Sequence, residues 1–127
     1  MYIEVTEQSL TFKNDQEATV LIARQQYDKE KKVCIVYLDG EVVSEVASAL
    51  YDELHALLSV GVGVILDMKK TTFLTPGFME DLIRLEHKAE SGNFDSMPIQ
   101  NVSKALYDEI RKAGFTKSLD IEQQEDV

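Results

Sequence analysis

The chain has 127 residues and a hydrophobic content of 44%, values typical of one globular domain, and a formal net charge of −10. The acidic balance argues against nucleic-acid binding and attachment to anionic lipid, because both require clusters of lysine and arginine. No apolar run is long enough to insert into a membrane and no signal peptide is visible, so we expect a single cytoplasmic domain spanning residues 1–127.

The first part of the chain is rich in β-strand patterns. Residues 1–18 are weakly patterned and predict either an N-terminal extension or an extra strand, with 2–5 as the candidate strand. Residues 19–27 and 33–38 predict two strands joined by a charged hairpin loop at 28–32. We expect Asp39-Gly40 to end the second of these strands.

A strand–helix–strand unit follows. Ser44 is expected to cap a helix, and Gly61 and Gly63 to end it. The inner face of this helix consists of Val46, Leu50, Leu54, Leu57 and Leu58. Residues 63–68 are apolar at consecutive positions, which is typical of a central strand. Such a unit predicts parallel strands joined by a right-handed crossover.

The third part of the pattern begins with a helix that starts at Pro76 and ends near residue 91. Its inner face consists of Phe78, Leu82, Leu85 and Ala89. Residues 94–99 predict a poor strand, because Pro98 lacks a backbone donor and confines the strand to an edge or prevents it.

The last part of the chain predicts a third helix after Asn101. Its inner face consists of Val102, Leu106, Ile110 and Ala113. Gly114 and Phe115 predict a Schellman-type end, in which the phenylalanine folds back over the helix. Residues 119–121 predict a short strand, and 122–127 an acidic tail that is expected to fray.

The side chains that usually carry catalysis or metal binding are sparse. Cys34, the only cysteine, lies in an apolar run and predicts a buried residue in a reducing compartment. His55 and His87 do not have metal-ligand spacing. We find neither a nucleophile elbow nor a phosphate-binding glycine loop. The sequence therefore predicts no catalytic residue, no metal and no cofactor.

Two residues near the strand at 63–68 still invite a functional interpretation. Asp67 lies at the carboxyl end of that strand, where it either organises the next loop or serves a ligand site. Thr75 precedes Pro76 at the start of a helix, whose free N–H groups and partial positive charge suit an anion. The alternative is that Thr75 only caps the helix.

Three short sequence motifs, in their order along the chain, resemble those of the STAS domain, which occurs in anti-sigma factor antagonists and related bacterial regulators. The motifs are Gly40-Glu41-Val42 after a strand, the segment 64–78, and Ala113-Gly114-Phe115 after the last helix. The resemblance covers about residues 19–121. We therefore expect an α/β domain with a mixed sheet of four to five strands and three main helices, largely on one face.

The STAS family has an Asp-Ser-Ser-Gly motif at the position of residues 74–77. A serine or threonine in this motif is phosphorylated by a partner kinase. By position, Thr75 matches that acceptor, Gly77 the glycine and Asp67 the acid at the strand end. Leu74 stands where the family has an acid, and Pro76 where it has a serine. We expect the N–H groups of Gly77 and Phe78 to face a phosphate on Thr75.

The first functional hypothesis is a non-enzymatic, protein-binding regulator that is switched by phosphorylation at Thr75. The resemblance implies an anti-sigma factor or a kinase-like regulator as its partner. The predicted contact surface is the loop at 70–77 with the second helix, and its candidate residues are Leu74, Pro76, Gly77, Met79 and Ile83. Core packing is the alternative interpretation for the apolar members of this set, Leu74, Met79 and Ile83.

Two further hypotheses remain open. The chain is a constitutive scaffold or a subunit of a larger complex, such as a lipid-transport assembly, that works without phosphorylation. Alternatively, it is a small-ligand binder or an enzyme that uses Asp67 and Thr75, which predicts a pocket at the strand end.

Overall fold

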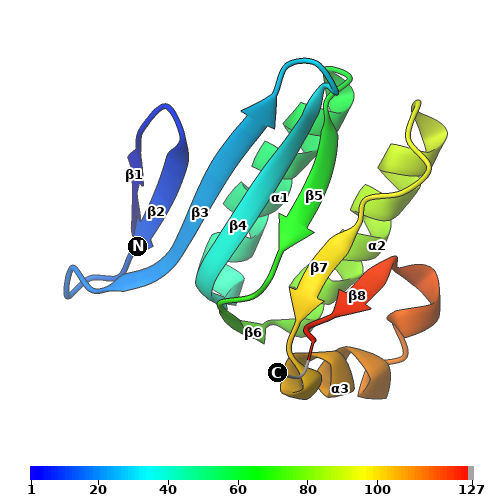
Figure 1. Cartoon of the computed structure of the whole chain (residues 1–127). Coiled ribbons are helices and arrows are strands. Elements are labelled where there is room, and N and C mark those ends of the chain that lie inside the picture. Colours follow the sequence, from blue (N-terminus) through cyan, green and yellow to red (C-terminus); the bar gives the residue numbers. More distant parts are fainter. Residues whose placement is uncertain (126–127) are drawn as a thin grey trace.

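The computed structural model describes residues 1–125, in which three α-helices pack on an eight-stranded mixed sheet (Figure 1). The strands are β1 (Tyr2–Val5), β2 (Ser9–Lys13), β3 (Thr19–Asp28), β4 (Val33–Val42), β5 (Gly63–Asp67), β6 (Thr71–Leu74), β7 (Ile99–Val102) and β8 (Ile121–Gln123). The helices are α1 (Ser44–Ser59), α2 (Pro76–Ser91) and α3 (Lys104–Lys112), with a short 3-10 turn at Thr116–Ser118.

The sheet has an antiparallel half and a parallel half. Its strand order is β1-β2-β3-β4-β5-β7-β8, and β6 pairs with the end of β4. β1 to β4 pair antiparallel, whereas β4, β5, β7 and β8 pair parallel. The predicted mixed sheet and the parallel strand–helix–strand unit are confirmed. The prediction of four to five strands was wrong, because short strands with weak patterns add to the sheet.

Residues 1–18 belong to the sheet. β1 and β2 form a hairpin that pairs with β3, and Phe12 of β2 is part of the core. The strand expected at 2–5 is confirmed, whereas β2 was not predicted.

Strand β4 does not end at Asp39-Gly40, as we expected from the sequence. It runs on to Val42 through a register shift at Gly40, whose φ is +126°. A Cβ at this position would lie 2.2 Å from the backbone oxygen of Val20. Glycine therefore bends the strand without ending it, which is a usual role for glycine in a bulge.

The core lies between the sheet and the two long helices, which cover the same face of the sheet in Figure 1. The predicted inner faces of α1 and α2 are buried, except that Leu57 is only half-buried. Ser44 is the first residue of α1, so the predicted cap is wrong, and Val43 occupies the cap position. Cys34 is buried in the core as expected, and burial raises the pKa of its thiol.

The strand expected at 94–99 lies farther along the chain, at Ile99–Val102. This strand is β7, and it lies between β5 and β8 rather than at an edge. Pro98 precedes the strand, and its carbonyl accepts a bond from the Leu66 N–H at 2.9 Å. Pro98 therefore contributes an acceptor to the pairing with β5 but no donor, and the strand begins after it.

The third helix begins later than predicted. Ser103 caps it, Val102 belongs to β7, and Ala113 is exposed rather than on the inner face. The Schellman end is confirmed, because the Phe115 N–H donates to the Ile110 oxygen at 3.2 Å.

The predicted last strand lies two residues farther along, at Ile121–Gln123. Part of the expected acidic tail is therefore paired, and residues 126–127 of that tail lie outside the described residues. None of the helices in residues 1–125 has the length and apolar character that crossing a membrane requires.

Candidate functional site

Helices α1 and α2 begin side by side. β6 runs parallel to the end of β4, with Leu74 opposite Val42, and the Thr75 N–H donates to the Val42 oxygen at 2.9 Å. Both helices start directly after these paired strands. As a result, the hydroxyl oxygens of Ser44 and Thr75 are 3.4 Å apart.

Thr75 occupies the cap position of α2, but its hydroxyl does not cap the helix. Its backbone carbonyl accepts the N–H groups of Phe78 at 3.0 Å and Met79 at 3.2 Å. Phe78 therefore cannot also serve a phosphate, contrary to our expectation. Pro76 has no N–H, so the free backbone donor at this helix start is Gly77, for which residues 1–125 provide no acceptor.

A groove of about 540 Å³ runs between the first turns of α1 and α2. It combines hydroxyl groups with charged groups, and the polar side chains that line it are Ser44, Ser48, Tyr51, Thr75, Glu80, Asp81 and Arg84. Thr75 and Gly77 also line this groove, so it reaches the start of α2.

The charges in the groove are partly paired. Arg84 Nη1 lies 2.9 Å from Asp81 Oδ1, in a salt bridge one turn apart on α2. Burial raises the pKa of the Asp81 carboxyl, although the Arg84 charge opposes this shift. Glu80 and Asp81 make the groove acidic, and Arg84 is the cation that lines it. A new negative charge at Thr75 therefore adds to an acidic surface.

The predicted contact residues separate into buried and exposed groups. Leu74 and Met79 are core residues with 2% and 5% exposure, which corresponds to the packing alternative. Ile83 is half-buried, whereas Pro76 and Gly77 are exposed. The assignment of this surface to a partner stays a prediction.

Sequence reasoning missed Phe73, which is 43% exposed beside the start of α2. Simple alternation along β6 does not indicate it, because Thr72 and Phe73 are both exposed between the buried Thr71 and Leu74. The cause is a register shift in the pairing of β6 with β4, which the sequence pattern does not reveal.

Asp67 organises the loop after β5. Its Oδ1 accepts the Lys69 N–H at 3.0 Å, and its Oδ2 accepts the side-chain amide of Asn101 at 2.8 Å. Both carboxylate oxygens are thus used to join β5 to its loop and to the end of β7.

The hollow beside Asp67 is small, at about 100 Å³, whereas sites for small ligands measure roughly 300–1,000 Å³. Thr75 lines the other groove, so in residues 1–125 no detected cavity contains both residues. This arrangement gives no support to a ligand site made of Asp67 and Thr75.

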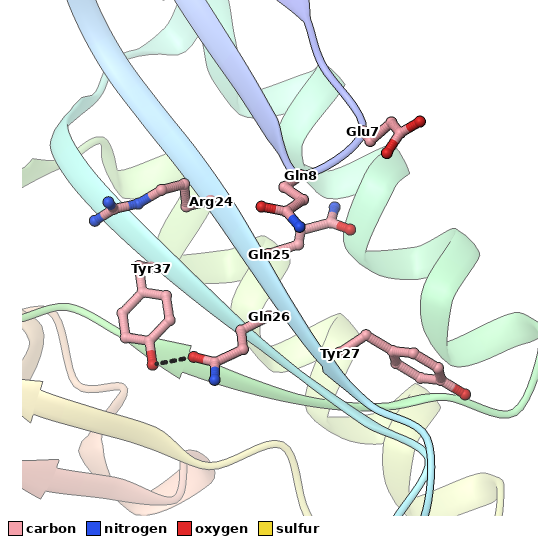
Figure 2. A pocket seen from close by; sticks show the side chains of 7 residues that line it. All are labelled: Glu7, Gln8, Arg24, Gln25, Gln26, Tyr27 and Tyr37. Carbon is pink, nitrogen blue, oxygen red and sulfur yellow. Dashed lines mark hydrogen bonds between the residues drawn. The ribbon is translucent and has the colours of Figure 1, made fainter.

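A hollow of about 580 Å³ lies beside the second half of β3, where β2 no longer pairs with it, and is also lined by the loop before β2 and by Tyr37 of β4. Figure 2 shows that Arg24 and Tyr27 point away from each other there, while the Tyr37 hydroxyl bonds Gln26 Oε1 at 3.1 Å. Arg24, whose guanidinium carbon is 6.0 Å from the centre of the Tyr37 ring, gathers with Tyr37 and Gln26, whereas Tyr27 lies apart from them. Residues 1–125 also hold no group of three or more His, Cys, Asp or Glu side chains placed to bind a metal ion.

No family model matches the sequence, and no curated protein matches it. Among solved structures, an anti-sigma factor antagonist from Mycobacterium paratuberculosis is similar, with a TM-score of 0.69, 16% identity and coverage of 87% of this chain and 90% of that one. The unphosphorylated anti-sigma factor antagonist SpoIIAA is similar with a TM-score of 0.64, 11% identity and coverage of 78% and 86%.

A sulfate transporter family protein from Wolinella succinogenes is similar as well, with a TM-score of 0.60, 19% identity and coverage of 78% and 81%. At these identities the likeness concerns the fold. This similarity of fold agrees with the resemblance found in the sequence motifs, and the chain therefore has the STAS fold.

Proposed function

We propose that this chain is a non-enzymatic regulatory module that binds a protein partner, and that phosphorylation of Thr75 releases the partner. The observation that carries the proposal is the Thr75 hydroxyl, which lies at the start of α2 without capping it. Two structures of similar fold are anti-sigma factor antagonists, one of them described in its unphosphorylated form. An anti-sigma factor or a kinase-like regulator is therefore the partner we infer.

The docking surface is the start of α2 together with the exposed ring of Phe73. Pro76 and Gly77 present little side chain, so a partner can approach the backbone of this turn closely. The aromatic ring supplies apolar area next to that turn, and buried aromatic side chains often dominate binding energy in interfaces.

The switch works through charge. A phosphate adds about −1.5 to −2 charges. The helix start accommodates it, because the Gly77 N–H is free and the helix dipole is positive there. A partner surface that buries this turn must then desolvate the phosphate next to Glu80 and Asp81. Binding is lost while the fold is kept.

The experiment is an affinity pull-down from a soluble extract of the source organism, with wild type, Thr75→Glu and Thr75→Ala as baits. Ser91→Glu is the matched control, because it adds the same charge to an exposed hydroxyl position at the other end of α2. We expect wild type, Thr75→Ala and Ser91→Glu to retain a kinase-like or sigma-regulating protein that Thr75→Glu loses. Equal retention by all four baits would refute the switch.

A second candidate function is a constitutive scaffold within a larger complex. Two observations favour it: Leu74 is a core residue at the position of the family's acid, and Pro76 removes one N–H from a phosphate site. A sulfate transporter family protein has the same fold, so the fold itself occurs outside sigma regulation. This candidate predicts that Thr75→Glu and Thr75→Ala retain the same partners as wild type.

A further inference from the structure

Exposed apolar side chains are concentrated at β1 and the residue before it, along one of the two edges of the sheet. In the described part of the chain, seven large hydrophobic residues are exposed, and four of them lie within residues 1–5. Ile3 and Val5 are 43% and 69% exposed, although they lie opposite Phe12 and Leu10 on the helix-covered face. Figure 1 shows that the helices do not reach over β1. The apolar side chains at this edge of the core are therefore exposed to solvent.

The backbone of β1 is also open along its outer edge. The Thr6 N–H donates to the Ser9 oxygen at 2.9 Å, so Thr6 turns its backbone groups toward β2. Because these groups alternate along a strand, those of Ile3 and Val5 point outward. Lysine, proline and bulges are among the features that protect natural edge strands, and β1 has none of these; its protection consists of its four-residue length and the charge of Glu4.

We propose that two copies of the chain associate by antiparallel pairing of their β1 strands, with Ile3 of each copy opposite Ile3 of the other. In this register Tyr2 lies opposite Glu4 of the second copy. Two neighbouring registers also keep the faces aligned. One places Glu4 opposite Glu4, and like charges in directly opposite positions are unfavourable. The other places Tyr2 opposite Tyr2 and leaves Glu4 and Val5 of β1 without a partner. A shift by a single residue would turn the apolar side chains to the wrong face.

The pairing of the two β1 strands joins the two sheets into one. It also brings together the exposed apolar side chains at the edges of the two cores. Ile3 and Val5 of both copies come together on the helix-covered face, and the outward N–H and C=O groups of Ile3 form hydrogen bonds across the axis. A pairing of four-residue strands buries less than a standard interface, so we expect a Kd of roughly 10–100 µM. Neither β1 nor β2 contributes to the groove between α1 and α2, which stays open in the dimer.

The proposal also predicts an unusual salt dependence. Each copy carries a formal net charge of −10, so the two copies repel one another at low ionic strength. Added salt screens this repulsion. We expect dimer formation to strengthen by at least threefold between about 50 and 500 mM salt, whereas an interface held by ion pairs would weaken.

Sedimentation velocity over roughly 5–500 µM brackets the expected affinity. We expect Ile3→Lys to weaken the wild-type dimer at least tenfold. Val60→Lys is the matched control, because Val60 is the most exposed large hydrophobic residue within residues 1–125, at 76%, and lies at the end of α1. A wild-type chain that stays monomeric over this range, or an equal effect of both variants, would overturn the proposal.

Disulfide trapping tests the register. In the proposed pairing, the two Ile3 Cα atoms are about 5.5 Å apart, within disulfide range, and the two Glu4 Cα atoms are more than about 7 Å apart. Cys34 is buried and does not compete. We expect Ile3→Cys to form a covalent dimer under mild oxidation much faster than Glu4→Cys or Val60→Cys. Faster trapping by Glu4→Cys would contradict this register.

Discussion

The starts of α2 and α3 differ in how they use a hydroxyl. Thr75 and Ser103 occupy the same cap position with nearly the same backbone conformation, φ −65° and ψ 146° against φ −63° and ψ 156°. The Ser103 hydroxyl accepts the Leu106 N–H at 3.2 Å. At α2 the equivalent N–H, that of Phe78, is taken by the backbone carbonyl of Thr75.

The comparison shows that a favoured cap residue in a favoured conformation is not always a cap. At α2 the hydroxyl is redundant for the helix and lies beside Ser44 instead. Its only side-chain hydrogen bond is the exposed one of 3.4 Å with the Ser44 hydroxyl, which is long, so we expect modification of Thr75 to cost the fold little. The hydroxyl of Ser103 therefore caps its helix, whereas that of Thr75 does not, and the proposed switch uses the second of these.

The largest effect should come from the residue that sets up the start of α2. Gly40→Ala places a Cβ 2.2 Å from the Val20 oxygen in a backbone of positive φ, and this bulge aligns β6 with β4. We expect a loss of at least about 3 kcal/mol in the free energy of unfolding, measured in urea.

Gly77→Ala is the control for that substitution, because a Cβ there meets nothing within 4 Å. It should change the free energy of unfolding by less than about 1 kcal/mol. Equal losses for the two glycines would show that the bulge at Gly40 does not hold the structure.

Ser103→Ala should destabilise the protein by about 1 kcal/mol, the usual cost of losing a helix cap. In a domain of this size that corresponds to roughly 4 °C in Tm. Thermal unfolding checks this value, and Ser103→Asp, which can still accept the Leu106 N–H, should recover most of the loss. No loss with alanine would mean that Ser103 is as redundant as Thr75.

Glu86 extends the comparison to a buried polar group on α2. Its Oε2 accepts the Met97 N–H at 2.8 Å, and burial raises the pKa of its carboxyl despite that bond. The folded state therefore holds this proton more tightly than the unfolded state. Its contribution to stability is full below the unfolded pKa of about 4.3 and is lost as pH rises through the folded pKa.

Glu86→Gln keeps an acceptor for Met97 and removes the charge. We expect it to be more stable than wild type by about 1 kcal/mol at pH 7 and equal to it near pH 4. Urea unfolding of both proteins at the two pH values provides the test. A constant difference would mean that the charge of Glu86 plays no part.

The smallest effect should come from Thr75→Ala. Since its hydroxyl caps nothing, the free energy of unfolding should change by less than about 0.5 kcal/mol. Urea unfolding beside Ser103→Ala gives the measurement. A loss as large as that of Ser103→Ala would show that Thr75 is a structural cap after all.

The elements with a strong periodic pattern could be predicted from the sequence. The strands at 19–27, 33–38 and 63–68 and the inner faces of α1 and α2 follow from burial of one face or of a central strand. The strands β1, β2, β6 and β8 could not be recognised fully, because three- to five-residue strands at edges and turns give too few alternations to detect.

The candidate site could be located but not resolved in detail. The Thr-Pro-Gly motif identified the start of α2, because threonine is favoured at the cap of a helix and proline at its first position. It did not show whether Leu74 or Phe73 faces outward, since that depends on the register shift in the pairing of β6 with β4. It also did not show which acceptor takes the Phe78 N–H, because the carbonyl and the hydroxyl of Thr75 both lie close to it.

The most direct test of the central claim is a calorimetric titration of the partner recovered by pull-down against wild type, Thr75→Ala, Thr75→Glu and Ser91→Glu. We predict that Thr75→Ala and Ser91→Glu bind within threefold of wild type, and that Thr75→Glu binds at least about tenfold more weakly, or 1.4 kcal/mol. Binding of Thr75→Glu with wild-type affinity would contradict the account.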